Sequence, residues 1–355
     1  MDLSADNNLN TDNLSGETNN GFEQNESNVS ELGERRLYAF DKDAVLNKIE
    51  ALKDSVGKVI VGQEKVVDMI LASVLADGHV LLEGVPGVAK TLTARLISKL
   101  IGSTFSRIQF TADLMPSDVL GTNVFNVKTS EFEFHKGPAF GDIVLADEIN
   151  RAPAKTQSAL FEVMEERQTT IDGVCYQMGD IYTILATQNP VEQEGTYRLP
   201  EAQMDRFLVK INIGYPSLEE EIDVLKRHDK NKKFTKLENV SAVITKEELL
   251  MLRDCMHSVR VEPCMMAYIA QIVQSTRNHK NIYLGASPRA SVALMRMAKA
   301  NALMDGRDFV APDDVKAMAI PVLEHRVTLS TETEMEGHSV VEVLKKLVED
   351  VDVPK

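Results

Sequence analysis

The chain has 355 residues, of which 43% are hydrophobic and 26% are charged, and this composition is typical of a globular protein with room for about two domains. Its net charge of −15 argues against binding nucleic acid over a broad surface, because that binding depends on Lys and Arg neutralising phosphates. No apolar run reaches the roughly 18 residues of a membrane span, and the first residues lack the basic and apolar regions of a secretory signal, so we expect a cytoplasmic protein.

Residues 1–36 are rich in Asn, Ser, Glu and Asp. This segment has little apolar surface to bury, so we expect a disordered acidic tail. It is either a plain solvated tail or a tether for a partner. From Leu37 onwards the composition is that of a folded domain.

The first half of the folded part alternates between helices and strands. Helical periodicity covers residues 44–56, 91–101 and 156–165, and another predicted helix ends at Leu75. Short apolar runs predict strands over residues 80–82, 108–110, 143–146, 182–187 and 207–213. Such strands separated by helices are typical of a mostly parallel sheet covered on both faces. Between residues 111 and 142 apolar and polar residues alternate instead, which predicts an inserted hairpin.

The second half is predicted to be helical. Helical periodicity covers residues 217–227, 245–258, 263–276, 288–304, 312–323 and 340–348, with a short extended segment at 327–329. Three of these helices open with proline at the first helical position, where its missing N–H costs nothing. The sequence therefore predicts an α/β domain over residues 37–215, followed by a smaller all-helical domain over residues 216–355.

A phosphate-binding loop is the strongest functional signal in the sequence. Its residues are Gly84, Val85, Pro86, Gly87, Val88, Ala89, Lys90 and Thr91. They link a predicted strand to a predicted helix, a setting in which backbone N–H groups surround a phosphate. Lys90 would reach the β- and γ-phosphates, and the Thr91 hydroxyl would ligate Mg²⁺. Ala89 stands where the usual pattern has a second glycine, so an ordinary turn with a chance Lys-Thr pair is the alternative.

Two carboxylates, Asp147 and Glu148, end the apolar run 143–146. At the carboxyl edge of a parallel sheet, Asp147 can hold Mg²⁺ through water, and Glu148 can orient and deprotonate an attacking water. The alternative is an acidic strand end that begins a loop, and the phosphate loop upstream makes this alternative much weaker.

Three more polar residues complete the candidate site. Asn189 follows the strand 182–187 and could contact the γ-phosphate or the water, although a turn residue before proline is an equal alternative. Arg206 precedes the strand 207–213, and Arg289 opens a helix of the second domain. A surface salt bridge is the default role of any single arginine.

Together these residues resemble the AAA+ ATPases, and specifically the MoxR family. The resemblance covers the chain from about Leu37 to Pro354. The phrases that carry it are Gly84–Thr91, Phe110–Thr111, Leu114–Asp118, Gly137–Pro138, Ala146–Pro153, Ala186–Pro190, Gly195–Tyr197, Leu199–Gln203, Asp205–Phe207, Gly285–Arg289 and His325–Arg326. The family pattern has alanine at the position of Ala89, whereas Arg198 stands where proline is expected.

The resemblance implies an ATP site with Mg²⁺ and assigns a role to each residue. Lys90 and Thr91 are similar to Walker A, with Thr91 and Asp147 as the magnesium residues, and Asp147 and Glu148 to Walker B. Asn189 is similar to sensor 1, Arg206 to the arginine finger and Arg289 to sensor 2 in the helical lid. The segment Val61, Gly62 and Gln63 resembles the one that lines the adenine pocket, and the hairpin within 111–142 resembles the helix-2 insert of this clade.

In such proteins the arginine finger comes from the neighbouring subunit, so the resemblance implies a homo-oligomeric ring, with a hexamer as the expected size. It also implies a chaperone-like ATPase that matures or activates client proteins, some with von Willebrand factor A domains. On this interpretation ATP closes the lid through Arg289 and the insert remodels the client. The alternatives are a nucleotide-gated scaffold with little turnover, a DNA-associated AAA+ motor, which the charge disfavours, and a subunit similar to magnesium chelatase.

Overall fold

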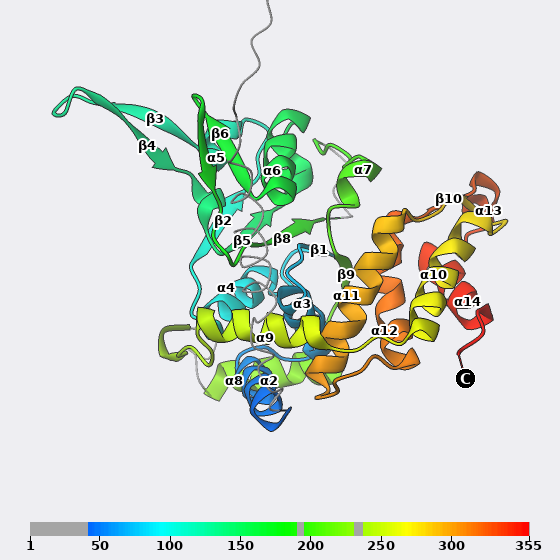
Figure 1. Cartoon of the computed structure of the whole chain (residues 1–355). Coiled ribbons are helices and arrows are strands. Elements are labelled where there is room, and N and C mark those ends of the chain that lie inside the picture. Colours follow the sequence, from blue (N-terminus) through cyan, green and yellow to red (C-terminus); the bar gives the residue numbers. More distant parts are fainter. Residues whose placement is uncertain (1–41, 190–194, 231–236, 355) are drawn as a thin grey trace, which may run out of the picture. The chain divides into compact units, whose positions relative to one another are not determined.

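The structure is a computed structural model (Figure 1) that describes residues 42–189, 195–230 and 237–354. All of the described residues belong to one compact unit. The predicted tail, residues 1–36, lies outside them. In the part of the chain that the structure describes, no helix combines the length and the apolar character needed to cross a bilayer.

A five-stranded parallel sheet forms the centre of the first half, in the order β2-β5-β8-β1-β9. The strands are β1 (Val80–Gly84), β2 (Phe105–Gln109), β5 (Ile143–Asp147), β8 (Thr183–Gln188) and β9 (Val209–Ile213). The predicted parallel sheet is confirmed. The strand predicted at residues 108–110 begins earlier, at Phe105. β2 is an edge strand, where polar residues are tolerated, so its short apolar run marks only part of the strand.

Helices cover both faces of this sheet (Figure 1), with α6 (Ala154–Glu166) on one side and α3 (Glu64–Leu75) and α4 (Lys90–Leu100) on the other. Leu160, Phe161 and Met164 of α6 belong to the same buried apolar cluster as strand residues of β1, β5 and β8. The helix α2 (Lys42–Gly57) precedes α3. The predicted α/β architecture therefore has a continuous apolar core on the α6 face.

Two hairpins project beside the sheet. The predicted one consists of β3 (Gly121–Asn126) and β4 (Glu131–Lys136) and follows the short helix α5 (Pro116–Leu120). The second, β6 (Gln168–Ile171) with β7 (Val174–Gln177), was not predicted from the sequence. Phe134 of the first stacks on Tyr176 of the second with ring centroids 4.1 Å apart, so the two hairpins contact each other.

The second half is a helical lid, as predicted. Its helices are α8 (Leu218–Lys230), α9 (Lys246–Ser258), α10 (Pro263–Asn278), α11 (Pro288–Met304), α12 (Pro312–Leu323), α13 (Thr331–Met335) and α14 (Val340–Asp350). A short antiparallel pair, β10 (Ile282–Leu284) with β11 (Thr328–Leu329), adds to the helices and contains most of the predicted extended segment. The boundary after residue 215 stays a prediction.

Short helical elements complete the described chain. They are α7 (Glu201–Met204) and the 3₁₀ turns η1 (Pro138–Phe140), η2 (Ile149–Arg151), η3 (Leu237–Asn239) and η4 (Glu324–Arg326).

A buried arginine joins the lid to the segment before β9. Arg326 is 3% exposed, and its Nε donates to Asp205 Oδ1 at 2.7 Å while its Nη1 donates to the carbonyl of Leu208 at 3.1 Å. Burial lowers the pKa of Arg326, and the Asp205 carboxylate opposes that shift. A buried charge is tolerated only when it is paired in this way, so the pair fixes the segment that carries Arg206.

His79, which directly precedes β1, gives the fold a predicted pH dependence. Its Nδ1 accepts from the N–H of Ile184 at 3.0 Å and its Nε2 lies 3.1 Å from the carbonyl of Met164. Burial lowers the pKa of His79 from 6.5 to about 4. Below pH 6.5 the unfolded chain therefore binds a proton that the folded chain does not, and stability is lost as the pH falls from about 6.5 to 4.

We expect His79 to lower the free energy of unfolding by about 2 kcal/mol when the pH falls from 7 to 5. Urea denaturation of the wild type and of His79→Gln at both pH values measures it, since other titrating groups contribute to both proteins. An equal loss in the two proteins would contradict the assignment to His79.

Candidate active site

The phosphate loop has the backbone that its sequence predicts. It runs from the end of β1 to the first turn of α4, and both Gly87 and Ala89 have left-handed φ values, +88° and +58°. Gly84 must be glycine for another reason: a Cβ there would lie 2.7 Å from the carbonyl oxygen of Ile213. Successive N–H groups in such a turn, at a helix N-terminus, form a concave site for an anion.

Lys90 lies across the base of this loop. Its Nζ donates to the carbonyl of Gly84 at 2.7 Å. Burial lowers its pKa, and the carboxylates of Asp147, Glu148 and Glu83 oppose that shift. The nearby carboxylates therefore favour the charged ammonium, which is the form that binds phosphate.

The two carboxylates at the end of β5 are held differently. Asp147 Oδ1 accepts from Thr187 Oγ1 and Oδ2 accepts from Arg107 Nη2, both at 2.6 Å. Glu148 Oε2 accepts from Gln109 Nε2 at 2.9 Å and lies 3.0 Å from Arg151 Nε. The predicted pair thus lies on the sheet's carboxyl edge, where side chains of the neighbouring strands and of the following turn hold both carboxylates.

Sequence reasoning missed Arg107, Gln109 and Thr187. They come from β2 and β8, the two strands that flank β5 in the sheet. The sequence contains a usable signal, because Gln109 and Thr187 are polar residues near the ends of predicted strands and Arg107 directly precedes one. Only the strand order shows that they face Asp147 and Glu148.

The backbone of Glu148 is also unusual. Its φ is +58°, in the left-handed region that residues with a Cβ avoid. Its N–H donates to Thr187 Oγ1 at 2.8 Å. This turn directs the Glu148 side chain away from the β5 strand direction and towards Gln109 and Arg151.

Residues with suitable chemistry for Mg²⁺ lie at this edge. Thr91 offers a hydroxyl in the first turn of α4, and Asp147 offers carboxylate oxygens, which are ligands that Mg²⁺ accepts together with waters and phosphates. Among the described residues no group of three His, Cys, Asp or Glu side chains could hold a metal. The donors therefore fit a magnesium ion bound jointly with a nucleotide.

Asn189 follows β8, next to the carboxylates. Residues 146 and 186 are partners across the β5–β8 ladder, so Thr187 is level with Asp147 and Asn189 lies two residues further along the chain. Its side chain is buried, at 5% exposed. This position suits a group that contacts a phosphate or a water at the strand ends.

The turn Val61–Gln63 reaches the phosphate loop through one side chain. Gln63 Nε2 donates to the carbonyl of Val88 at 3.0 Å. Gly62 has φ +72°, and a Cβ there would lie 2.3 Å from Cδ of Glu220 in α8. The turn is thus held between the loop and the first lid helix.

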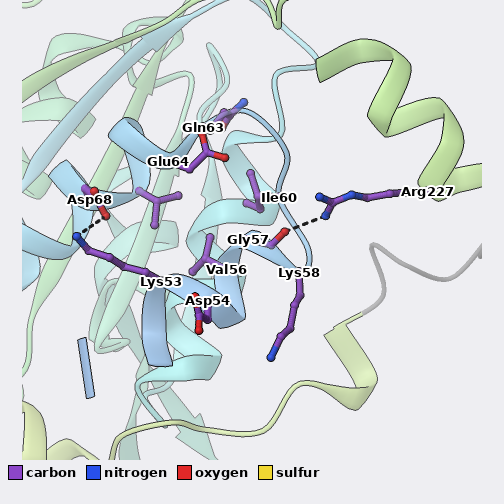
Figure 2. Close-up of a pocket in the computed structure, with 11 residues that line it drawn as sticks. Lys53, Asp54, Val56, Gly57, Lys58, Ile60, Gln63, Glu64, Asp68 and Arg227 are labelled. Carbon is purple, nitrogen blue, oxygen red and sulfur yellow. Dashed lines mark hydrogen bonds and ion pairs between the residues drawn. The ribbon is translucent and has the colours of Figure 1, made fainter. Parts of the chain in front are cut away.

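A cavity of about 590 Å³ adjoins this turn (Figure 2). Gln63, Ile60 and Lys53 line it, and Arg227 of α8 reaches its rim, where Nη1 donates to the carbonyl of Gly57 at 2.8 Å. No residue of the phosphate loop lines this cavity. Gln63 thus links the cavity to the phosphate loop, and the base pocket expected at Val61, Gly62 and Gln63 stays a prediction.

The two predicted arginines lie together, but away from the phosphate loop. Arg206 and Arg289 line one pocket of about 320 Å³, along with Gly78 and His79. Arg206 Nη1 donates to the carbonyl of Phe161, and Arg289 Nη2 lies 2.7 Å from Glu165 Oε1. Phe161 and Glu165 both belong to α6, so this helix contacts both arginines.

This pocket lies at the amino ends of the sheet's strands, whereas the phosphate loop lies at their carboxyl ends. Gly78 and His79 precede β1, whereas the phosphate loop follows it. The five residues of β1 span roughly 13 Å at about 3.3 Å per residue. None of the residues 84–91 lines the arginine pocket. Arg206 and Arg289 therefore face away from the phosphate loop of their own protomer.

Comparison with known proteins gives two family matches. The model of the ATPase family associated with various cellular activities (AAA) matches residues 79–209, and that of the AAA lid domain matches residues 274–347.

Individual proteins are similar over most of the chain. An "uncharacterized protein YeaC" of Bacillus subtilis is 48% identical over 301 residues, covering 85% of this chain and 93% of that protein. The "chaperone MoxR1" of Mycobacterium tuberculosis is 41% identical over 321 residues, covering 88% and 84%. The crystal structure of a "putative ATPase" from Cytophaga hutchinsonii has a TM-score of 0.82 at 40% identity, covering 93% of this chain and 99% of that one.

Proposed function

Because the chain belongs to the MoxR family of AAA+ ATPases, we propose that it hydrolyses Mg²⁺-bound ATP at sites that two neighbouring protomers complete. One observation carries this proposal: the phosphate loop and the pair Arg206 and Arg289 lie at opposite edges of one sheet. The length of β1, roughly 13 Å, separates the arginines of a protomer from its own phosphate loop. A neighbouring copy can supply them instead.

Within one protomer, the loop amides and Lys90 bind the phosphates. Thr91 and Asp147 hold the magnesium ion, which supplies charge neutralisation on the phosphate oxygens when it is bound. Glu148, held by Gln109 and Arg151, orients the attacking water and accepts its proton. Asn189 contacts the γ-phosphate or that water, and Val61, Gly62 and Gln63 border the base.

Between protomers, the arginines stabilise the charge that develops on the transferring phosphoryl group. A contact that joins two different faces of the same chain is heterologous, and it closes into a ring when the rotation permits. We expect a hexamer. In this arrangement Arg289 acts across the interface beside Arg206, and the sequence-based hypothesis that ATP closes the lid through Arg289 stays a prediction.

Assembly and activity should therefore be coupled. We expect the ATPase rate per protomer to rise with protein concentration and to reach a plateau when the ring has formed, and EDTA to abolish it at every concentration. Steady-state phosphate release alongside sedimentation velocity measures both quantities. A constant rate per protomer across the range in which the assembly dissociates would contradict the shared site.

We further propose that the ATPase cycle remodels client proteins in the cytoplasm, consistent with the relative that is named a chaperone. Phe125, Val127 and Phe132 at the end of the first hairpin are 49%, 81% and 72% exposed, and an exposed apolar patch of this kind suits contact with a protein. Clients with von Willebrand factor A domains are the first to test. Stimulation of turnover by such a domain, lost in Phe132→Ser, would support this role.

Two other functions give different results in the same assays. A nucleotide-gated scaffold would bind client and ATP with hardly any turnover. A DNA-associated motor would bind DNA in a salt-dependent way, against the net charge of −15.

A further inference from the structure

The helix α6 (Ala154–Glu166) connects the catalytic carboxylates to the arginines of the same protomer. At its first turns, the buried Gln157 donates from Nε2 to the carbonyls of Ile149 and Ala152 at 3.1 and 3.0 Å, in the turn that follows Glu148. About one turn later Phe161 contacts Arg206, and about two turns later Glu165 contacts Arg289. From Gln157 to Glu165 the helix rises about 12 Å.

The contact of Arg289 with Glu165 is of a different kind from that of Arg206. Arg206 donates to a backbone carbonyl, which carries no net charge. Arg289 uses both terminal nitrogens on one carboxylate, with Nη2–Oε1 at 2.7 Å and Nη1–Oε2 at 3.5 Å. The N–H groups of Arg289 that would bind a phosphate held by a neighbouring protomer therefore point at Glu165 instead.

The other acidic residues that line this pocket have other partners. Asp77 lies 2.9 Å from Arg167 and 2.6 Å from Arg253. Asp205 binds the buried Arg326 and accepts from Ser287 Oγ at 3.1 Å.

Of these ion pairs, Arg289 with Glu165 is the most exposed. Arg289 is 60% exposed and Glu165 is 35% exposed, so an incoming group can reach both. Among the described residues lining the pocket, Glu165 is the acid that faces Arg289.

We propose that Glu165 is a positioning residue that holds Arg289 on its own protomer as an internal counter-ion, and that the γ-phosphate bound by the neighbouring protomer must displace it. This rests on the proposed function, because it assumes that Arg289 acts across the interface. A phosphate of higher charge than a carboxylate replaces Glu165 on the guanidinium, and no covalent bond changes. The released Glu165 lies at the end of α6, and the first turns of α6 contact the segment after Glu148. Nucleotide binding in one site is thereby linked to the conformation of the next site.

The test is Glu165→Gln, which keeps the shape of the side chain and removes its charge. An exposed ion pair is weak, so we expect the protein concentration that gives half the maximal ATPase rate to fall about 2- to 5-fold. Glu162→Gln is the matched control, because it makes the same charge change in the same helix and Glu162 does not line the pocket. Glu165→Asp, which keeps the charge but shortens its reach, should give a smaller shift in the same direction.

The double variant Glu165→Gln/Arg289→Ala distinguishes the positioning of Arg289 from a purely structural role of Glu165. Its half-maximal protein concentration should equal that of Arg289→Ala alone. An unchanged or raised half-maximal concentration in Glu165→Gln would overturn the inference, as would the same shift in the Arg289→Ala background. Either result would leave the proposed function intact, provided that inactive variants of Arg206 and Lys90 still complement each other. If Arg289→Ala is fully active and that complementation fails, both proposals are wrong.

Discussion

Replacement of Glu148 by Gln is expected to leave ATP binding intact and to lower turnover about 10²–10⁴-fold. The amide keeps the size of the side chain and its contact with Gln109, but it cannot accept the proton of the attacking water. Steady-state phosphate release measures the rate, and a fluorescent ATP analogue measures the affinity.

Glu349→Gln is the control for this change, since Glu349 is an exposed residue of α14 far along the chain from the site. Turnover of Glu148→Gln within a few-fold of the wild type would remove Glu148 from the role of base. Loss of nucleotide binding together with turnover would instead mean that the carboxylate supports the loop and not the chemistry.

Arg206→Ala is expected to lower the ATPase rate about 10³–10⁵-fold, the range that an arginine acting on the transferring phosphoryl group contributes. Mixing this variant with Lys90→Ala should restore activity, because each protomer then supplies the half of the site that the other lacks. In a random 1:1 mixture about a quarter of the interfaces join an intact phosphate loop to an intact arginine. Recovery should therefore approach a quarter of the wild-type rate, whatever the ring size.

Arg260→Ala provides the control, because Arg260 is 64% exposed and lies outside the arginine pocket. Arg206 also donates to the carbonyl of Phe161, so thermal melting of Arg206→Ala must confirm that the protomer is folded. If mixed assemblies form and no activity returns, the arginine does not act in the neighbouring site.

Much of the fold was predictable because its signals are local. The strands β5 and β8 are buried throughout or nearly so, and their unbroken apolar runs are what a strand covered on both faces requires. The hairpin β6–β7 gave no such signal. Apolar and polar residues are mixed in its two strands, half of its eight strand residues are exposed, and its turn at Asp172-Gly173 lies between segments without clear alternation.

The site residues that could be predicted are those adjacent in the sequence to a predicted strand. The phosphate loop and the two carboxylates each lie next to a strand that the sequence marks. The partners of those carboxylates, such as Arg107 and Thr187, depend on which strands are neighbours. The place of Arg289 depends on how the lid packs on the α/β part, and no local pattern reports that packing.

Two of the six described non-glycine residues with positive φ lie in the candidate site. Ala89 and Glu148 both have φ +58°, and each such residue costs the folded state about 1 kcal/mol. Glycine or asparagine would relax either position, so a selection for heat resistance alone would enrich such variants at Glu148 and remove the carboxylate that we propose as the proton acceptor. Substitutions that raise the thermal stability of this protein should therefore be sought at positions other than Ala89 and Glu148.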